Sequence, residues 1–176
     1  MNTKVTIRAF TEADAPEVRD LFIRVNRLLA PADMKDAFEA YIVSSLGEEI
    51  DRISDYYCDH RGSFWVAQSD VGIVGMFGLE PSRPGAMELR RMYVNPDQRR
   101  QGIAAKMLKF AEQHCRANAL TQLDLSTSEI QGDALAFYRA SGYELVREET
   151  ADAANNKTIG GGIRRYHFRK ALLIRD

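Results

Sequence analysis

Residues 87–106 read MELRRMYVNPDQRRQGIAAK, and this stretch decides the fold. Residues 87–94 are predicted to form a β-strand that stops at Asn95-Pro96, because proline lacks the N–H that would continue the ladder. A basic turn follows, and Gly102 opens a predicted helix over residues 103–118. The first turn of a helix presents backbone N–H groups and the positive end of the helix dipole. Since glycine lets an anion approach the main chain closely, this turn is predicted to bind phosphate.

Two familiar phosphate-binding sequences are absent from the chain. A P-loop needs Gly-Lys followed by Ser or Thr, and a dinucleotide fold needs G-x-G-x-x-G with an acidic residue about 20 positions on. The pattern that is present, Arg99-x-x-Gly102-x-Ala104, resembles the R/Q-x-x-G-x-G/A signature of the GNAT superfamily of acetyl-CoA-dependent N-acetyltransferases.

A second motif strengthens this resemblance. Residues 131–143 read QGDALAFYRASGY, which is similar to the family's N-x-x-A-x-x-L-Y-x-x-x-G-F, with Gln131, Phe137 and Tyr143 in place of Asn, Leu and Phe. The resemblance implies an α/β GNAT acyl-CoA N-acyltransferase fold. Its central mixed sheet is mostly antiparallel and splays between the fourth and fifth strands, and helices cover both faces.

Length and composition agree with a single domain over residues 1–176. The chain is 45% hydrophobic and 28% charged, which suits a globular protein with a full core. A formal charge of −1 argues against nucleic acid as the main partner. The chain lacks an apolar run of membrane-spanning length and a signal-peptide core, so we expect a cytoplasmic protein without a membrane partner. Its cysteines and histidines lack the spacing of metal ligands, so no metal site is expected.

The remaining elements follow from periodicity and breakers. A strand over residues 5–9 precedes a helix that is capped at Thr11 and runs to about Leu29. Two more helical segments, 34–45 and 48–58, are predicted on either side of Gly47. The rest is a hairpin of 63–68 with 72–79, a turn at 81–85, strands at 122–127, 143–149 and 163–171, and a polar loop at 151–162. The family order is β-α-α-β-β-β-α-β-α-β-β.

Apolar residues in the strand over 87–94 fall out of phase. Leu89 has odd parity, whereas Met92 and Val94 have even parity, and period-two geometry cannot place all three on one face. We therefore predict an inserted residue, a β-bulge, near Arg90 to Met92. The GNAT resemblance implies a bulge at the same place, where the splayed strand admits the pantetheine arm of CoA.

The resemblance implies direct transfer of an acetyl group from acetyl-CoA to an amine. An alkyl amine has a pKa of about 10.4, so it must lose a proton before it attacks. Glu88 is the candidate base, because it lies eleven residues before Arg99, the spacing at which many family members carry a catalytic Glu. The alternative is a solvated carboxylate or a partner for Arg90, and Glu129, Asp124 and water are weaker candidates for the base.

Tyr138 matches the motif tyrosine that the family points at the CoA sulfur, so it is the candidate acid for the departing thiolate; its alternative is packing on the sheet. The free N–H near Met92 is the predicted oxyanion donor. The predicted CoA-binding residues are Met92, Tyr93, Val94, Arg99, Arg100, Gln101, Gly102, Ile103, Ala104, Ala105, Gln131 and Tyr138.

The acceptor is expected to meet residues from two regions. Phe38 and Tyr41 lie where the family uses helices as one wall of the acceptor pocket, and core packing is the alternative. Arg164-Arg165-Tyr166-His167 follows a triple glycine, and Arg164 and Tyr166 are candidate contacts that favour a carboxylate or phosphate on the acceptor. The alternative is the exposed face of a terminal strand.

Three functions fit these motifs. The leading hypothesis is an acetyl-CoA-dependent N-acetyltransferase that acts on a small-molecule primary amine and predicts a closed pocket walled by residues 31–60. A protein acetyltransferase, acting on an N-terminus or a lysine, predicts an open groove instead. A noncatalytic acyl-CoA-binding module predicts a lost acid or a disordered phosphate turn. The sequence names neither the acceptor nor the oligomeric state, and the GNAT resemblance implies only that a homodimer is common.

Overall fold

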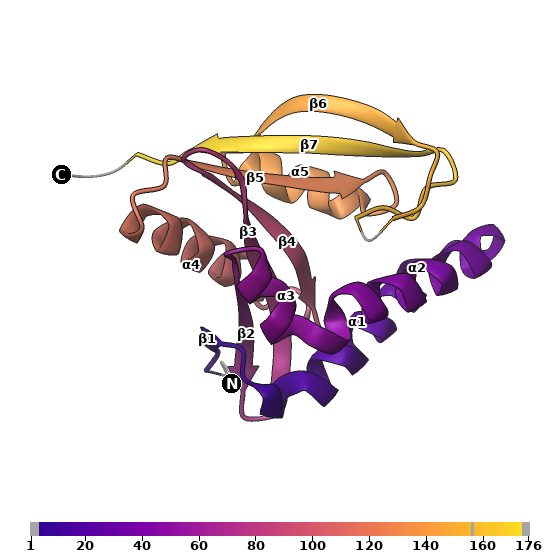
Figure 1. Ribbon diagram of the computed structural model, residues 1–176, viewed down its shortest axis with the longest axis horizontal. Coiled ribbons are helices and arrows are strands. Elements are labelled where there is room, and N and C mark those ends of the chain that lie inside the picture. Colours follow the sequence, from indigo (N-terminus) through magenta and orange to yellow (C-terminus); the bar gives the residue numbers. More distant parts are fainter. Residues whose placement is uncertain (1–3, 156, 174–176) are drawn as a thin grey trace.

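A computed structural model describes residues 4–155 and 157–173. Its strands form one seven-stranded sheet in the order β1-β2-β3-β4-β5-β7-β6 (Figure 1). Among these described residues only β4 and β5 pair in parallel, and every other neighbouring pair is antiparallel. The strands are β1 Thr6–Ala9, β2 Ser63–Ser69, β3 Gly72–Arg83, β4 Ala86–Val94, β5 Gln122–Ser128, β6 Glu144–Ala151 and β7 Ile163–Ala171.

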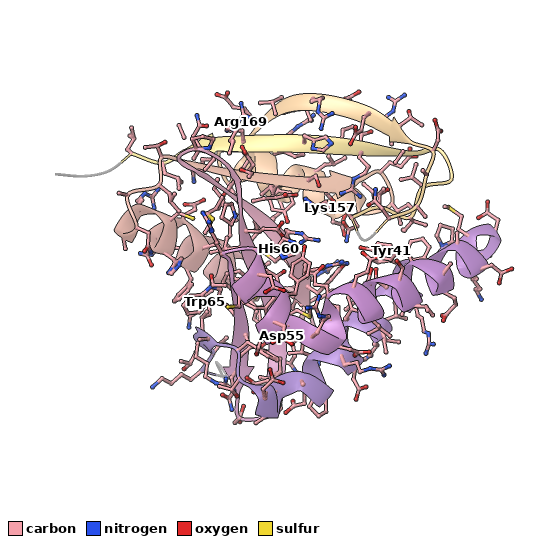
Figure 2. All side chains as sticks on the ribbon, viewed as in Figure 1. Tyr41, Asp55, His60, Trp65, Lys157 and Arg169 are labelled. Carbon is pink, nitrogen blue, oxygen red and sulfur yellow. The ribbon has the colours of Figure 1, made fainter. Side chains whose placement is uncertain are left out.

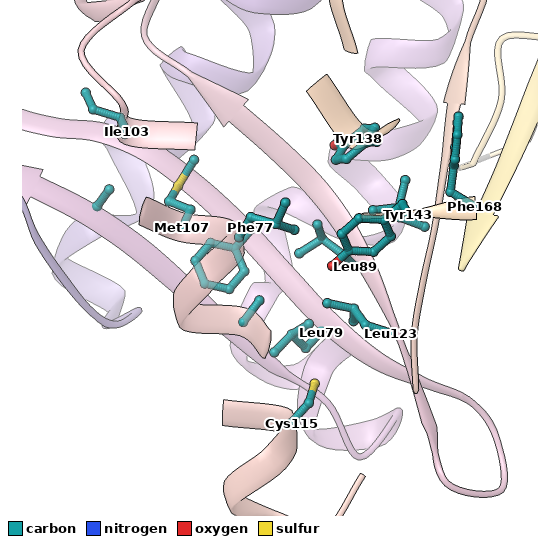
Figure 3. Close-up of a cluster of buried hydrophobic side chains, with 14 of the residues drawn as sticks. Phe77, Leu79, Leu89, Ile103, Met107, Cys115, Leu123, Tyr138, Tyr143 and Phe168 are labelled. Atoms are coloured by element: carbon teal, nitrogen blue, oxygen red, sulfur yellow. The ribbon is translucent and has the colours of Figure 1, made fainter. Parts of the chain in front are cut away.

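Helices cover both faces of this sheet. On one face lie α4 (Ile103–Ala117) and α5 (Gly132–Ala140), and on the other lie α1 (Ala15–Leu29), α2 (Lys35–Glu48) and α3 (Ile53–Asp59). Figure 3 shows the core under α4 and α5, where the helix residues Met107 and Tyr138 share one cluster with Leu89 and Leu123 of the sheet. The predicted mixed α/β fold is confirmed.

The entry to α1 is held by a buried carboxylate. Asp14 accepts a hydrogen bond from the backbone N–H of Thr11 at 2.8 Å, as the predicted cap requires, and it also accepts two from the Arg8 guanidinium. The hydrogen bond from Arg8 lowers the pKa of Asp14 to about 2. The carboxylate is therefore ionised at neutral pH and fixes the turn between β1 and α1.

Two predicted boundaries were wrong. Gly47 does not separate two helices but lies inside α2, which ends at Glu48, because the burial of Leu46 and Ile50 outweighs a glycine penalty of about 1 kcal/mol. Pro81 does not begin a turn, since β3 continues to Arg83. At that point β3 pairs with β4 alone, and an edge strand tolerates a proline.

The predicted bulge lies in β4 and is confirmed. Gly78 pairs with Arg90 and Met76 pairs with Tyr93, so Phe77 faces two residues of β4 where a regular ladder has one. Arg91, in this bulge, has a φ of 54°, a left-handed conformation that is uncommon for a residue with a side chain. The parallel pairing of β4 with β5 ends at Leu89 and Leu125. The two strands therefore splay beyond this point, as the resemblance to the GNAT fold implied.

Candidate active site

A cavity of about 110 Å³ opens where β4 and β5 separate. Its floor is the bulged segment of β4, and its sides are the end of β5, α5, α1 and α2, and the loop before β7. Tyr41 of α2 and Lys157 of that loop lie on its facing sides (Figure 2). A second cavity of about 460 Å³ continues from it across the face of β5, β7 and β6. The two share five lining residues: Glu88, Ser126, Lys157, Thr158 and Arg165.

Tyr138 reaches the first cavity from α5. Its ring packs at centroid distances of 5.9 Å from Tyr143 and 6.0 Å from Phe168, so the side chain is 7% exposed. Within the described residues its hydroxyl has no hydrogen-bond partner. Burial, followed by the nearby Tyr93, raises the pKa of Tyr138 above its usual value of about 10. The cavity therefore receives a protonated O–H that is available to donate.

Three charged residues meet at the base of this cavity, and sequence reasoning did not find their interaction. The Glu49 carboxylate is fully buried and accepts hydrogen bonds from Arg91 Nη2 at 2.8 Å and from Arg90 Nη2 at 3.1 Å. Tyr57 donates to the same carboxylate at 2.7 Å. Arg91 also donates to the Tyr41 hydroxyl at 2.7 Å. The network thus ties both arginines of the β4 bulge to α2 and α3.

Charges in this network stabilise one another. Burial raises the pKa of Glu49, but the attraction of Arg91 and then Arg90 outweighs it, so the net pKa is below the usual value. Burial likewise lowers the pKa of Arg90, whereas Glu49 and then Glu80 raise it to a net value above normal. Glu80 is a further partner, because Arg90 Nη1 donates to it and to Tyr56. A signal for this network did exist, since two arginines in mid-strand need a carboxylate if they are buried.

Glu88 lies beside the splay and lines both cavities. Its side chain is 22% exposed and forms an ion pair with Lys157 Nζ at 3.1 Å. The alternative partner considered from the sequence, Arg90, is instead paired with Glu49 and Glu80. Asp124, a weaker candidate for the base, already binds Arg83 at 3.2 Å and Arg169 at 2.9 Å.

The predicted phosphate turn lies at the start of α4. Gly102 has a φ of 75° and Arg100 has a φ of 62°. The first hydrogen bond of the helix runs from Lys106 N to Gly102 O, so the N–H groups of residues 103–105 precede it. A Cβ on Gly102 would meet no atom within 4 Å, so the space above this turn is open. Arg99 and Arg100 are exposed at its edge.

Some of the residues predicted to bind CoA line the first cavity, and others lie outside it. Met92 and Tyr93 line it, as does Gln131, whose Oε1 accepts a hydrogen bond from Thr127 at 2.8 Å. Val94 is not a lining residue and pairs with Gly75 in the ladder of β3 and β4. The turn over residues 99–105 lies outside the lining of both cavities.

Predicted acceptor residues divide in the same way. Phe38 and Tyr41 line the first cavity from α2. Arg164 and Tyr166 line neither cavity, contrary to expectation, and the residue that does so is Arg165 between them. Side chains alternate along β7, so Tyr166 packs toward the core under α5 while Arg165 points to the other face.

The described part of the chain contains no group of three or more His, Cys, Asp or Glu residues able to hold a metal ion. None of its helices has the length and apolar character needed to span a bilayer.

Comparison with known proteins gives consistent results. Residues 60–145 match the family model described as an acetyltransferase (GNAT) domain. Human N-acetyltransferase 8 is 32% identical over 116 residues, which are 62% of this chain and 51% of that protein. The chain thus spans about half the length of the curated relatives it matches.

Solved structures of low sequence identity share the fold. Spermidine N-acetyltransferase from Vibrio cholerae, in complex with CoA and spermine, has a TM-score of 0.71 at 14% identity, covering 96% of this chain and 95% of that chain. Ribosomal-protein-alanine N-acetyltransferase from Brucella melitensis has a TM-score of 0.70 at 18% identity, covering 95% and 99%.

Proposed function

Because this chain belongs to the GNAT superfamily of acetyltransferases, we propose that it transfers the acetyl group of acetyl-CoA to the primary amine of a small molecule. The observation that carries the proposal is the hydroxyl of Tyr138 at the splay of β4 and β5, which has no hydrogen-bond partner among the described residues. A noncatalytic CoA-binding protein has no use for a buried proton donor in this cavity.

The turn at the start of α4 is proposed to bind the pyrophosphate of CoA. Its open N–H groups, the helix dipole and the exposed Arg99 and Arg100 together favour an anion. The pantetheine arm then lies along β4 toward the splay, where Met92 and Tyr93 line the cavity and present backbone groups for pairing. This path places the thioester between the β4 bulge and Tyr138.

Gly102→Ala tests the proposed binding of CoA at this turn. The new Cβ fits without a clash but enters the open space above the turn, so we expect the affinity for CoA to fall about tenfold. Its left-handed φ predicts a loss of about 1–2 kcal/mol in the free energy of unfolding. Calorimetric titration with CoA measures the first effect. Gly47→Ala, inside α2 with equally open surroundings, is the matched control and should leave CoA affinity unchanged.

The proposed reaction deprotonates the acceptor, joins its nitrogen to the acetyl group and releases the thiol of CoA. Acetyl-CoA supplies an activated acetyl group, and Glu88 accepts the proton of the acceptor ammonium directly or through water. The amine nitrogen forms a bond to the carbonyl carbon, while N–H groups of the β4 bulge donate to the carbonyl oxygen. The nitrogen, which still carries two protons after its attack, loses one of them to solvent. The C–S bond breaks, and Tyr138 donates a proton to the sulfur and regains one from solvent. The products are an amide and a thiol.

Glu88→Gln tests the base. Removing the carboxylate is expected to lower kcat about 10²-fold at neutral pH, with a smaller change in KM. The loss should shrink as the pH approaches the pKa of the acceptor amine, since the free amine then needs no base. Glu129→Gln is the control, because the Glu129 side chain is exposed and, among the described residues, accepts a hydrogen bond only from the backbone N–H of Arg164. Equal kcat values for Glu88→Gln and the wild type would mean that water alone, and not Glu88, accepts the proton of the acceptor.

The shape of the site favours a small acceptor. Phe38 and Tyr41 of α2 and the loop residues Lys157 to Ile159 enclose the first cavity on the side away from α5. An extended peptide needs an unobstructed groove at this point. Thiol release from acetyl-CoA, assayed with a library of small amines and a set of peptides, tests the proposal. Turnover with peptides alone would replace it by a protein acetyltransferase, and the absence of turnover with every amine would overturn it.

A further inference from the structure

Three arginines line the first cavity, and two of them are already neutralised. Arg90 and Arg91 bind the Glu49 carboxylate, and Arg90 binds Glu80 as well. Arg165 differs, because no carboxylate among the described residues lies within ion-pair distance of its guanidinium. Among the described residues, the guanidinium makes one hydrogen bond, which Nη2 donates to Ser126 Oγ at 2.7 Å.

Two acidic residues near Arg165 are bonded to other side chains. Glu149 is its cross-strand neighbour on β6, but that carboxylate binds His167 at 2.7 Å and Arg147 at 3.1 Å. Glu88 lines the same cavities, but it pairs with Lys157 at 3.1 Å. Burial lowers the pKa of Arg165. Burial also acts to lower the pKa of Arg90, but the attraction of Glu49 outweighs it and the net pKa of Arg90 is raised. A half-buried cation thus faces the cavities without an ion-pair partner among the described residues.

We propose that the acceptor amine carries a carboxylate, and that Arg165 and Ser126 bind this carboxylate where the two cavities join. The guanidinium has N–H groups beyond the one directed at Ser126, and its planar fork matches the two oxygens of a carboxylate. The Ser126 hydroxyl accepts from Arg165 and so keeps its own proton to donate to the acceptor. Glu88 lies in the same junction, close to where the amine must be deprotonated. The acceptors that fit are therefore amino acids and their derivatives with a free amine and a free carboxylate.

This inference rests on the proposed acetyl transfer and is tested with matched acceptors. Each common L-amino acid is compared with its carboxamide and with its decarboxylated amine, using saturating acetyl-CoA and thiol release as the readout. The wild type is expected to favour the acids over both analogues by at least about tenfold in kcat/KM. Because this comparison uses only the natural chain, it does not depend on whether a variant folds.

Arg165→Met keeps the bulk of the side chain and removes the charge. We expect kcat/KM for the acids to fall about 10²-fold, mainly through KM, while the carboxamides and simple amines change by less than about threefold. Arg164→Met is the matched control, because Arg164 is the adjacent residue of β7, is exposed, and lines neither cavity. Thermal melting and the Kd for CoA should be the same for both variants and the wild type.

The outcomes separate the two proposals. Acetyl transfer to simple amines with no preference for carboxylates, or an equal loss for all acceptors in Arg165→Met, would overturn the carboxylate site and leave the acetyltransferase intact. A preference for aminoalkyl phosphates over amino acids would also overturn it, because Arg165 would then serve a phosphate. No transfer to any amine, despite CoA binding, would refute the proposed function itself.

Discussion

Replacing Tyr138 with phenylalanine is expected to lower kcat about 10²- to 10⁴-fold while leaving the Kd for CoA within about twofold of the wild type. The ring that packs against Tyr143 and Phe168 is retained, so the position of α5 should not change. The hydroxyl makes no hydrogen bond within the described residues, so its removal leaves no protein group unpaired. Stability should therefore be nearly unaffected, and only the departure of the thiolate is slowed.

Tyr143→Phe is the matched control and should give the opposite result. Tyr143 is also buried, but its hydroxyl donates to Glu112 at 3.0 Å. Loss of a hydrogen bond to a charged group is expected to lower the free energy of unfolding by about 1.5–3 kcal/mol, with kcat unchanged. Urea denaturation and steady-state kinetics on both variants give a complete comparison. Undiminished kcat in Tyr138→Phe would remove the acid role.

The pH dependence follows from the burial of Tyr138. Burial raises the pKa of this hydroxyl, so it stays protonated throughout the neutral range and beyond pH 10. As a consequence, kcat of the wild type should show no loss from Tyr138 ionisation between pH 7 and pH 9. Any rise in that range belongs to deprotonation of the acceptor amine.

Local features of the site were predictable from the sequence because each depends on neighbouring residues. The bulge follows from parity alone, since Leu89 and Met92 cannot share a face of a regular strand. The turn before α4 follows from a strand end, a glycine and an amphipathic helix in direct succession. Gly102 is left-handed as a consequence of where it stands, and no distant contact is needed to explain it.

The acceptor side was less predictable because it depends on register. Ile163 and Phe168 are both buried but have opposite parity, so the pattern of β7 does not reveal which face Arg164 or Arg165 occupies. The register of β7 on β5, in which Arg165 pairs with Ser128, decides which face each arginine occupies. The candidates Arg164 and Tyr166 therefore lie on the predicted strand but line neither cavity.

Glu49 was missed for a related reason. It stands next to Glu48 at the end of a helix, where acidic residues are usually solvated, and its partners are 41 and 42 residues further along the chain. Only the packing of α2 and α3 over β4 brings Glu49 to the two arginines. This ion network holds the shape of the bulge, and the bulge in turn shapes the cavity.

Glu49→Gln is expected to lower the free energy of unfolding by about 3–5 kcal/mol, because it leaves two buried guanidinium groups beside each other without their shared carboxylate. Urea denaturation measures this change. The folded pKa of Glu49 is below the unfolded value, so its contribution is fully present above about pH 4.3 and is lost as the pH falls through the folded pKa. The difference between the wild type and Glu49→Gln should therefore narrow in acid.

Glu48→Gln is the control for this experiment, because Glu48 is exposed and bonds only Ser44 among the described residues. Its free energy of unfolding should stay within about 0.5 kcal/mol of the wild type. Adding Arg91→Met to Glu49→Gln removes one of the two buried guanidinium charges that shared the Glu49 carboxylate and should restore part of the lost stability. If Glu49→Gln is as stable as Glu48→Gln, the buried network does not hold α2 and α3 to the bulge. If the double variant regains stability but not kcat, Arg91 is needed to keep the bulge in the shape that presents its N–H groups to the cavity.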